Sequence, residues 1–157
     1  MMENMQKLKK TLMTSIFEVF EKMFYVFLEP VDNNAWNHHS IVSICFSGPM
    51  TGGLRACFSQ GLADAMVQNM LNVDESEITE KLREDCLKES VNMICGNFLR
   101  NIDSSKVFDL SLPICESGND ETGHTASGPS EQTLRLDFAS GSGMLGIIFS
   151  ISRIDEM

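Results

Sequence analysis

The chain has 157 residues, of which 43% are hydrophobic and 22% charged, and its formal net charge is -10 at pH 7. This size and composition are typical of one globular domain whose core needs no metal ion or disulfide, so we expect residues 1–157 to form a single domain. The excess of acidic residues repels phosphate backbones, which argues against nucleic acid as a partner, and it gives little help in holding an anionic membrane surface.

The cysteines and the N-terminal segment both favour a reducing, cytoplasmic environment. The five cysteines are odd in number and no two are spaced as Cys-x-x-Cys, which is more typical of reduced thiols than of a disulfide framework. Three lysines precede an apolar stretch near the N-terminus, but Glu18, Glu21 and Lys22 interrupt that stretch. Such charges argue against a secretory leader or a membrane span. We therefore expect a cytoplasmic protein with no membrane insertion.

The first part of the chain predicts a helix followed by two strands. Apolar residues recur at helical spacing over residues 8–28 and form one strong apolar face, which Pro30 would end. Residues 41–46 and 54–58 are short apolar runs typical of strands, and the Gly- and Pro-containing segment 47–53 would be the turn between them.

Two helices are expected next. Residues 60–71 have the spacing of a short amphipathic helix. Asp74 and Glu77 have the spacing of a capping box, in which each side chain accepts a hydrogen bond from the other residue's backbone N–H. We expect this box to begin a longer helix over residues 78–102.

After that helix the hydrophobic period changes to two, which predicts strands. Apolar and polar residues alternate over residues 107–112 and 133–138, and the more continuous apolar run at 144–154 predicts a central strand. The polar segment 116–130, rich in Gly and Ser, would be a mobile hairpin loop. The order helix, two strands, two helices, three strands predicts an α+β fold with a largely antiparallel sheet and helices packed on it.

Two other patterns resemble ligand sites but lack the context that such sites need. Residues 141–146 match G-x-G-x-x-G, but a strand-like sequence follows and offers no helix N-terminus for a pyrophosphate, so we expect a tight hairpin turn. His38 and His39 are adjacent and would point to opposite faces of a strand, so they could not easily share a metal ion. We expect the chain to bind no metal or cofactor of its own.

One face of the helix expected at 78–102 carries polar residues in an unusual pattern. Asp85, Glu89, Asn92 and Gly96 follow one another at steps of four, three and four residues, so they form one stripe along the helix. An apolar face, expected to pack on the sheet, consists of Leu87, Val91, Ile94 and Phe98. Exposed Glu and Asn usually belong to a solvated face. Asn and Gly, however, are poor helix formers, and Gly costs about 1 kcal/mol relative to Ala, so their presence here indicates a functional surface.

The stripe and its surroundings resemble the CheC, CheX and FliY family of chemotaxis phosphatases. That family carries an Asp or Ser, a Glu four residues later, an Asn three residues after that, and a proline about twenty residues further on. Asp85, Glu89, Asn92 and Pro113 match this frame, and the resemblance covers nearly the whole chain. CheC members have a second motif on the first helix, where this chain has Glu18 but no matching asparagine. The resemblance therefore implies one active surface, as in CheX.

The resemblance implies an enzyme that removes the phosphoryl group from the aspartyl phosphate of a CheY-like response-regulator receiver. Asn92 would orient the attacking water and Glu89 would pair with the receiver's lysine, while Asp85 and Gly96 would belong to the partner-binding surface. The Mg²⁺ would be supplied by the receiver, and the chain would form a homodimer. Two alternatives stay open: a non-catalytic receiver-binding or scaffold domain of the same fold family, and a ligand-binding domain that uses the Phe- and Met-rich first helix.

Overall fold

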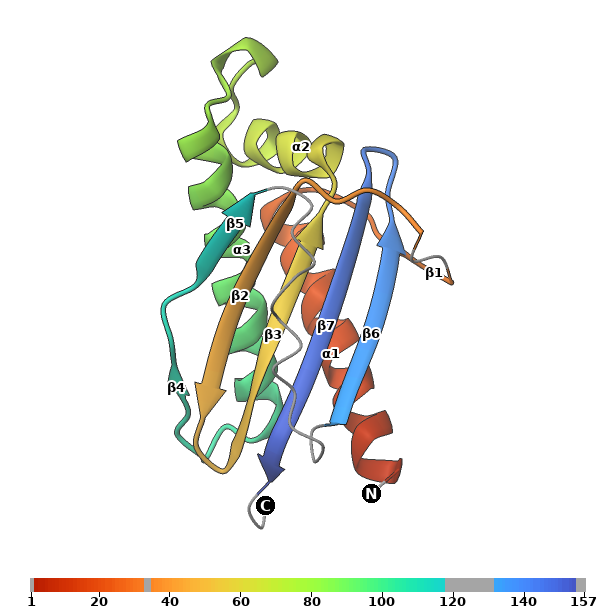
Figure 1. Cartoon of the computed structure of the whole chain (residues 1–157), viewed down its shortest axis with the longest axis vertical. Coiled ribbons are helices and arrows are strands. Elements are labelled where there is room, and N and C mark those ends of the chain that lie inside the picture. Colours follow the sequence, from red (N-terminus) through yellow and green to blue (C-terminus); the bar gives the residue numbers. More distant parts are fainter. Residues whose placement is uncertain (1, 33–34, 118–131, 155–157) are drawn as a thin grey trace.

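The computed structural model describes residues 2–32, 35–117 and 132–154, and in it a seven-stranded antiparallel sheet carries helices on one face (Figure 1). The elements in chain order are α1 (Met2–Met23), β1 (Glu29–Val31), β2 (Ser40–Ser47), β3 (Met50–Phe58), α2 (Gln60–Leu71), the 3-10 turn η1 (Glu75–Glu77), α3 (Glu80–Ile102), β4 (Asp109–Leu110), β5 (Ile114–Ser117), β6 (Gln132–Ala139) and β7 (Met144–Ile154). The predicted α+β class with an antiparallel sheet and packed helices is confirmed. The observed sequence of strands along the chain differs from the predicted one in two ways. It includes an additional short strand, β1, and it has two short strands, β4 and β5, in place of the single strand expected at 107–112.

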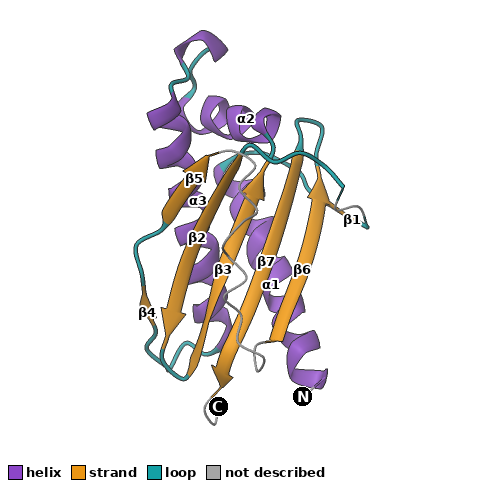
Figure 2. Ribbon diagram, in the orientation of Figure 1, coloured by secondary structure: helices purple, strands orange, loops and turns teal. Residues whose placement is uncertain are grey.

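The sheet has the strand order β1-β6-β7-β3-β2-β4, with β5 also paired to β2. Strand β7 lies between β3 and β6, so its predicted central position is confirmed. Helices α1 and α3 lie side by side behind the sheet, and α2 lies across one end of it (Figure 2). No helix in the described ranges has both the length and the apolar character needed to cross a bilayer.

The core lies between the sheet and the two long helices. Phe98 of α3 meets Phe149 of β7 edge to face with ring centroids 5.1 Å apart, and Phe149 stacks on Phe46 of β2 at 6.0 Å. Asn97 of α3 donates a hydrogen bond to Glu18 of α1 at 3.3 Å, which joins the two helices outside the core. The predicted apolar face of α3 is fully buried: Leu87, Val91, Ile94 and Phe98. Burial of such side chains contributes about 1.5–3 kcal/mol each and fixes the rotation of α3 on the sheet.

The first helix ends five residues earlier than predicted, at Met23. The N–H groups of Phe24 and Val26 both donate to the carbonyl of Phe20, and Tyr25 takes a left-handed conformation with φ of 53°. This turn leads the chain out of the helix, and the following apolar residues alternate between buried and exposed, as in extended chain.

The helix that carries the stripe begins at Glu80 and not at residue 78. The predicted capping box is present, but it caps η1: the Asp74 N–H donates to Glu77 Oε1 at 3.0 Å. Thr79 is the N-cap of α3, since its hydroxyl oxygen accepts from the Leu82 N–H at 3.1 Å.

The hairpin of β2 and β3 is longer than predicted, because Gly52 and Gly53 are strand residues. A side chain at Gly52 would overlap the carbonyl oxygen of Ser150 on β7. Glycine therefore serves close approach of two strands here, while the turn itself is at Gly48, where φ is +142°.

The strand predicted at 107–112 is largely absent. Only Asp109 and Leu110 pair with β2, and Val107 and Leu112 are 81% and 86% exposed. Of the loop expected at 116–130, the first two residues belong to β5, and residues 118–131 lie outside the described residues. The pattern at 141–146 forms the predicted hairpin turn, in which the Ser140 hydroxyl oxygen accepts from the Gly143 N–H at 3.1 Å.

Candidate functional site: a polar stripe on helix α3

The polar stripe lies on the side of α3 that faces away from the sheet. Asp85, Glu89 and Asn92 are exposed, and Gly96 is half-buried. The predicted grouping on one face is thus confirmed, because the buried apolar residues of α3 leave this side free.

Two stripe residues differ from their polar neighbours because they have no side-chain partner. Asp85 pairs with Lys81 at 3.4 Å, and on the adjacent row of the helix Glu84 pairs with Lys88 at 3.2 Å. Within the described part of the chain, the Glu89 carboxylate makes no ion pair, and the Asn92 amide makes no side-chain hydrogen bond.

The asparagines further along α3 behave differently. Asn97 donates to Glu18 of α1, and Asn101 donates to Ser15 of α1 at 3.4 Å and to the Asn97 side chain at 3.0 Å. These amides join two helices, whereas Asn92 is free to contact another molecule. Asparagines of the same helix therefore differ in their hydrogen bonding.

Packing does not explain the glycine of the stripe. A Cβ added at Gly96 would have no heavy atom within 4 Å apart from its own chain neighbours and helix backbone. Glycine costs about 1 kcal/mol relative to alanine in a helix interior, so it lowers the stability of α3 without relieving a clash. Its effect is a flatter surface beside Asn92, which another molecule can approach closely.

The cysteine beneath the stripe is not a nucleophile. Burial, and secondarily the charge of Glu89, raises the pKa of the Cys86 thiol to about 12. Its sulfur lies 3.8 Å from Met70 Sδ of α2. Because only the thiolate is strongly nucleophilic, a thiol of this pKa stays inert at neutral pH. The chemistry that the stripe offers is therefore that of one unpaired carboxylate, Glu89, and one amide, Asn92.

The two adjacent histidines lie in different surroundings. The His38 ring packs edge to face against Trp36 at 6.3 Å, and His39 Nδ1 lies 3.0 Å from the Ser40 hydroxyl. Across the described ranges, no three His, Cys, Asp or Glu residues are grouped as metal ligands.

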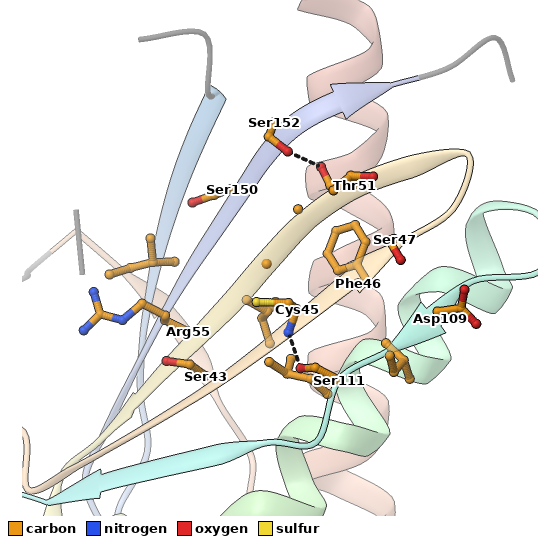
Figure 3. A pocket seen from close by; sticks show the side chains of 16 residues that line it. Ser43, Cys45, Phe46, Ser47, Thr51, Arg55, Asp109, Ser111, Ser150 and Ser152 are labelled. Atoms are coloured by element: carbon orange, nitrogen blue, oxygen red, sulfur yellow. Dashed lines mark hydrogen bonds between the residues drawn. The ribbon is translucent and has the colours of Figure 1, made fainter. Parts of the chain in front are cut away.

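A hollow of about 680 Å³ lies elsewhere, on the sheet between β2, β3 and β7 (Figure 3). Hydroxyl side chains such as Ser43 and Ser150 line it together with Arg55, whose Nε is buried without a partner among the described residues. None of the stripe residues lines this hollow. This hollow was not predictable from local sequence patterns, because it combines the β2–β3 hairpin with β7, which lies about a hundred residues later in the chain.

An exposed carboxylate and amide on a helix, neither of which lines a hollow found in the described residues, are typical of a surface that docks onto another macromolecule. The family model described as chemotaxis phosphatase CheX matches residues 40–136, which is more than half of the chain. The chain belongs to the CheX family, and the resemblance inferred from the motif is confirmed.

Solved structures share the fold over almost the whole chain. CheX from Vibrio vulnificus is 24% identical, with 92% of this chain and 95% of that chain covered and a TM-score of 0.77. CheX from Desulfovibrio desulfuricans is 21% identical, with 92% and 99% covered and a TM-score of 0.74. A CheX-CheY-BeF3-Mg²⁺ complex from Borrelia burgdorferi is 15% identical, with 92% and 97% covered and a TM-score of 0.68. The comparison with curated proteins found no match.

Proposed function

We propose that the chain is a phosphatase that hydrolyses the aspartyl phosphate of a CheY-like receiver domain. The observation that carries the proposal is the pair of unpartnered groups, Glu89 and Asn92, on the exposed side of α3 in a chain of the CheX family. The similar Borrelia burgdorferi structure is a complex of CheX with CheY, which supports a partner of this class.

In this proposal Asn92 enters the receiver's active site and orients the attacking water. The amide oxygen can accept a hydrogen bond from the water, the amide NH2 can donate one to a phosphoryl oxygen, and the group does not titrate. The water oxygen attacks phosphorus in line, and the bond from phosphorus to the aspartyl oxygen breaks, which releases the aspartate carboxylate. Inorganic phosphate leaves as H2PO4⁻, with the oxygen and both protons of the water. Orienting one water supplies about 3 kcal/mol, or on the order of 100-fold in rate. The Mg²⁺ that neutralises the phosphoryl group belongs to the receiver.

Glu89 fixes the docking register by pairing with a lysine of the receiver. The carboxylate is exposed and has no competing cation among the described residues, so docking breaks no existing ion pair. Asp85 lies one turn away at the edge of the same surface, where its pair with Lys81 leaves it partly neutralised. A soluble receiver as partner also fits the cytoplasmic location expected from the cysteines, which form no disulfide in the described part of the chain.

A phosphate-release assay tests the function. The chain is mixed at catalytic concentration with receiver domains that have been phosphorylated by a small-molecule donor, and phosphate is followed over several turnovers. Faster release than from the receivers alone supports the phosphatase. A receiver that binds but releases phosphate at its own rate would instead identify a non-catalytic binding domain.

Gly96→Ala separates folding from function at the edge of the stripe. Because no atom lies where the new methyl group would go, the free energy of unfolding should rise by about 1 kcal/mol. The same methyl group would hold the receiver away from Asn92, so the kcat/KM for dephosphorylation should fall about tenfold. Urea unfolding and the phosphate-release assay measure the two effects. Unchanged activity would show that the receiver does not approach this position.

We also propose a homodimer, formed through an edge of the sheet. Strand β2 offers no free edge, because it pairs with β3 on one side and with β4 and β5 on the other. The outer edge beside β5 instead exposes apolar side chains, with Leu112 86% and Ile114 63% exposed. Exposed apolar edges of this kind are a liability that a symmetric partner removes.

Light scattering at micromolar concentration should give twice the monomer mass of 17.5 kDa. A variant with Leu112→Lys and Ile114→Lys should have the monomer mass and keep its activity, because the stripe lies on α3 and not at this edge. A wild-type mass of 17.5 kDa would contradict the dimer and leave the phosphatase unaffected.

A further inference from the structure

A small hollow adjoins the C-terminal end of the stripe. It has a volume of about 170 Å³ and begins at Gly96. Its apolar lining combines α3 with the following segment: Leu99, Phe108 and Leu110. Two cationic residues, Arg100 and Lys106, also line it. Arg100 is also the next member of the stripe, four residues after Gly96.

The two cations, Arg100 and Lys106, form no ion pair in the part of the chain that the structure describes, although the whole chain has a net charge of -10. Asp103 accepts hydrogen bonds from the backbone N–H and the hydroxyl of Ser105. These bonds, and to a smaller extent the charge of Lys106, lower the pKa of the Asp103 carboxyl, but this carboxylate forms no ion pair with Lys106. A cation in the last turn of a helix is favourable for the helix dipole, which accounts for Arg100 alone. Lys106 lies beyond the helix end, so the dipole gives no reason for the pair.

The hollow lies within reach of any protein that docks on Asn92. At 1.5 Å rise per residue, Gly96 is about 6 Å and Arg100 about 12 Å from Asn92 along the helix axis. A standard interface covers about 800 Å² on each partner, which corresponds to a disc of about 16 Å radius. A receiver centred on Asn92 therefore covers the hollow. Covering two unpaired cations is unfavourable unless the receiver offers them negative charge.

We propose that this hollow is a second docking anchor, which takes an aspartate or glutamate side chain of the receiver. The inference rests on the proposed function and adds a specificity site to it. The side-chain methylene groups would pack on Leu99 and Phe108, and the carboxylate would pair with Arg100 and Lys106. Because the phosphoryl group is at Asn92, about 12 Å away along the helix, the anion held here is a different one. The Arg100 guanidinium suits a carboxylate, since its planar fork donates two parallel hydrogen bonds.

The charge pattern along α3 then selects one docking orientation. The acidic residues in its N-terminal half are already paired with basic residues, and Glu89 is an unpaired anion in the middle. The two cations without ion pairs lie in the last turn and just beyond the C-terminal end. A receiver must place a lysine on Glu89 and a carboxylate on Arg100 to match both. Rotating it by half a turn would bring like charges together, so this pair of anchors discriminates among receivers.

The test compares two double variants that change net charge equally. Arg100→Glu with Lys106→Glu reverses the charge of the anchor. The control, Lys9→Glu with Lys10→Glu, reverses the charge of two exposed lysines on α1. These lysines lie beside Phe17, whose ring contacts Phe138 of β6 rather than α3. The KM for the phosphorylated receiver should rise at least tenfold in the anchor variant, with kcat within twofold of wild type. The control variant should keep KM within twofold. A receiver whose contacting acidic residue is changed to arginine should bind the anchor variant more tightly than it binds the wild-type chain.

Each other outcome overturns the anchor. An equal rise of KM in both variants would show a general charge effect, and a fall of kcat alone would place these residues in the chemistry. A changed mass of the anchor variant in light scattering would assign the hollow to contacts between copies of the chain. If wild type is inactive, calorimetric titration of receivers into both proteins replaces kinetics. Binding unaffected by the reversal overturns the anchor alone, whereas no binding by wild type overturns the proposed function as well.

Discussion

Asn92→Ala will reduce the kcat for receiver dephosphorylation about 100-fold while leaving receiver affinity within about twofold of wild type. The loss follows from the amide's task, since alanine cannot orient the attacking water. The fold should be retained, because the Asn92 side chain is exposed and bonds to no other side chain that the structure describes. Alanine is also the better helix former, so the free energy of unfolding should change by less than about 1 kcal/mol.

Asn97→Ala is the matched control on the same helix. It removes the hydrogen bonds to Glu18 and from Asn101, so it should cost about 1 kcal/mol of stability. Its activity should stay near that of wild type. Urea unfolding and kinetics on both variants should therefore give opposite patterns. An active Asn92→Ala variant would refute the assignment of the water-orienting role to this residue.

Glu89→Ala will mainly raise the KM for the phosphorylated receiver, by about tenfold or more, because it removes one charge-assisted contact to the receiver's lysine. Activity should therefore return in large part at saturating receiver. Glu89→Gln keeps the shape but not the charge and should give a similar rise of KM. Glu84→Ala is the control, because Glu84 already pairs with Lys88 and is not a stripe residue. Steady-state kinetics over a wide range of receiver concentration measure all three.

A different kinetic result for Glu89→Ala would contradict the docking role proposed for Glu89. If affinity is unchanged and kcat alone falls, Glu89 acts on the reacting groups and not on docking. The surface position makes the comparison clean, since Glu89 supports no other described side chain through an ion pair. A loss of stability cannot then be mistaken for a loss of binding.

The parts of the fold that were predicted correctly are those that depend on local pattern. Helix α2 spans the predicted residues 60–71, and β7 is central, because periodicity and continuous apolar runs act within one element. The wrong predictions depend on distant contacts. β1 is a three-residue strand that pairs with β6 a hundred residues later, and Gly52 is required by Ser150 on another strand. The alternation of apolar and polar residues over 107–112 wrongly predicted one continuous strand, because a segment at the edge of a sheet can leave its apolar residues exposed.

The same distinction holds for the candidate site. Asp85, Glu89, Asn92 and Gly96 lie on one helix, so spacing alone places them on one face, and the motif links them to the CheX family. The adjacent hollow was not predictable, because it combines the end of α3 with residues of the connection to β4. Arg100 continues the spacing of the stripe, since it follows Gly96 by four residues. No local pattern indicates, however, that Lys106 lines the same hollow.

Decay of a phosphorylated receiver in the presence of a tenth as much of this chain tests the central claim, that α3 accelerates aspartyl-phosphate hydrolysis through Asn92. The wild-type chain should dephosphorylate all of the receiver at a rate well above that of the receiver's spontaneous dephosphorylation. Chelation of Mg²⁺ should abolish this acceleration. Asn92→Ala should leave the receiver to decay at close to its own rate although it still binds. Equal acceleration by wild type and Asn92→Ala, or none by either with the receiver bound, would contradict the account.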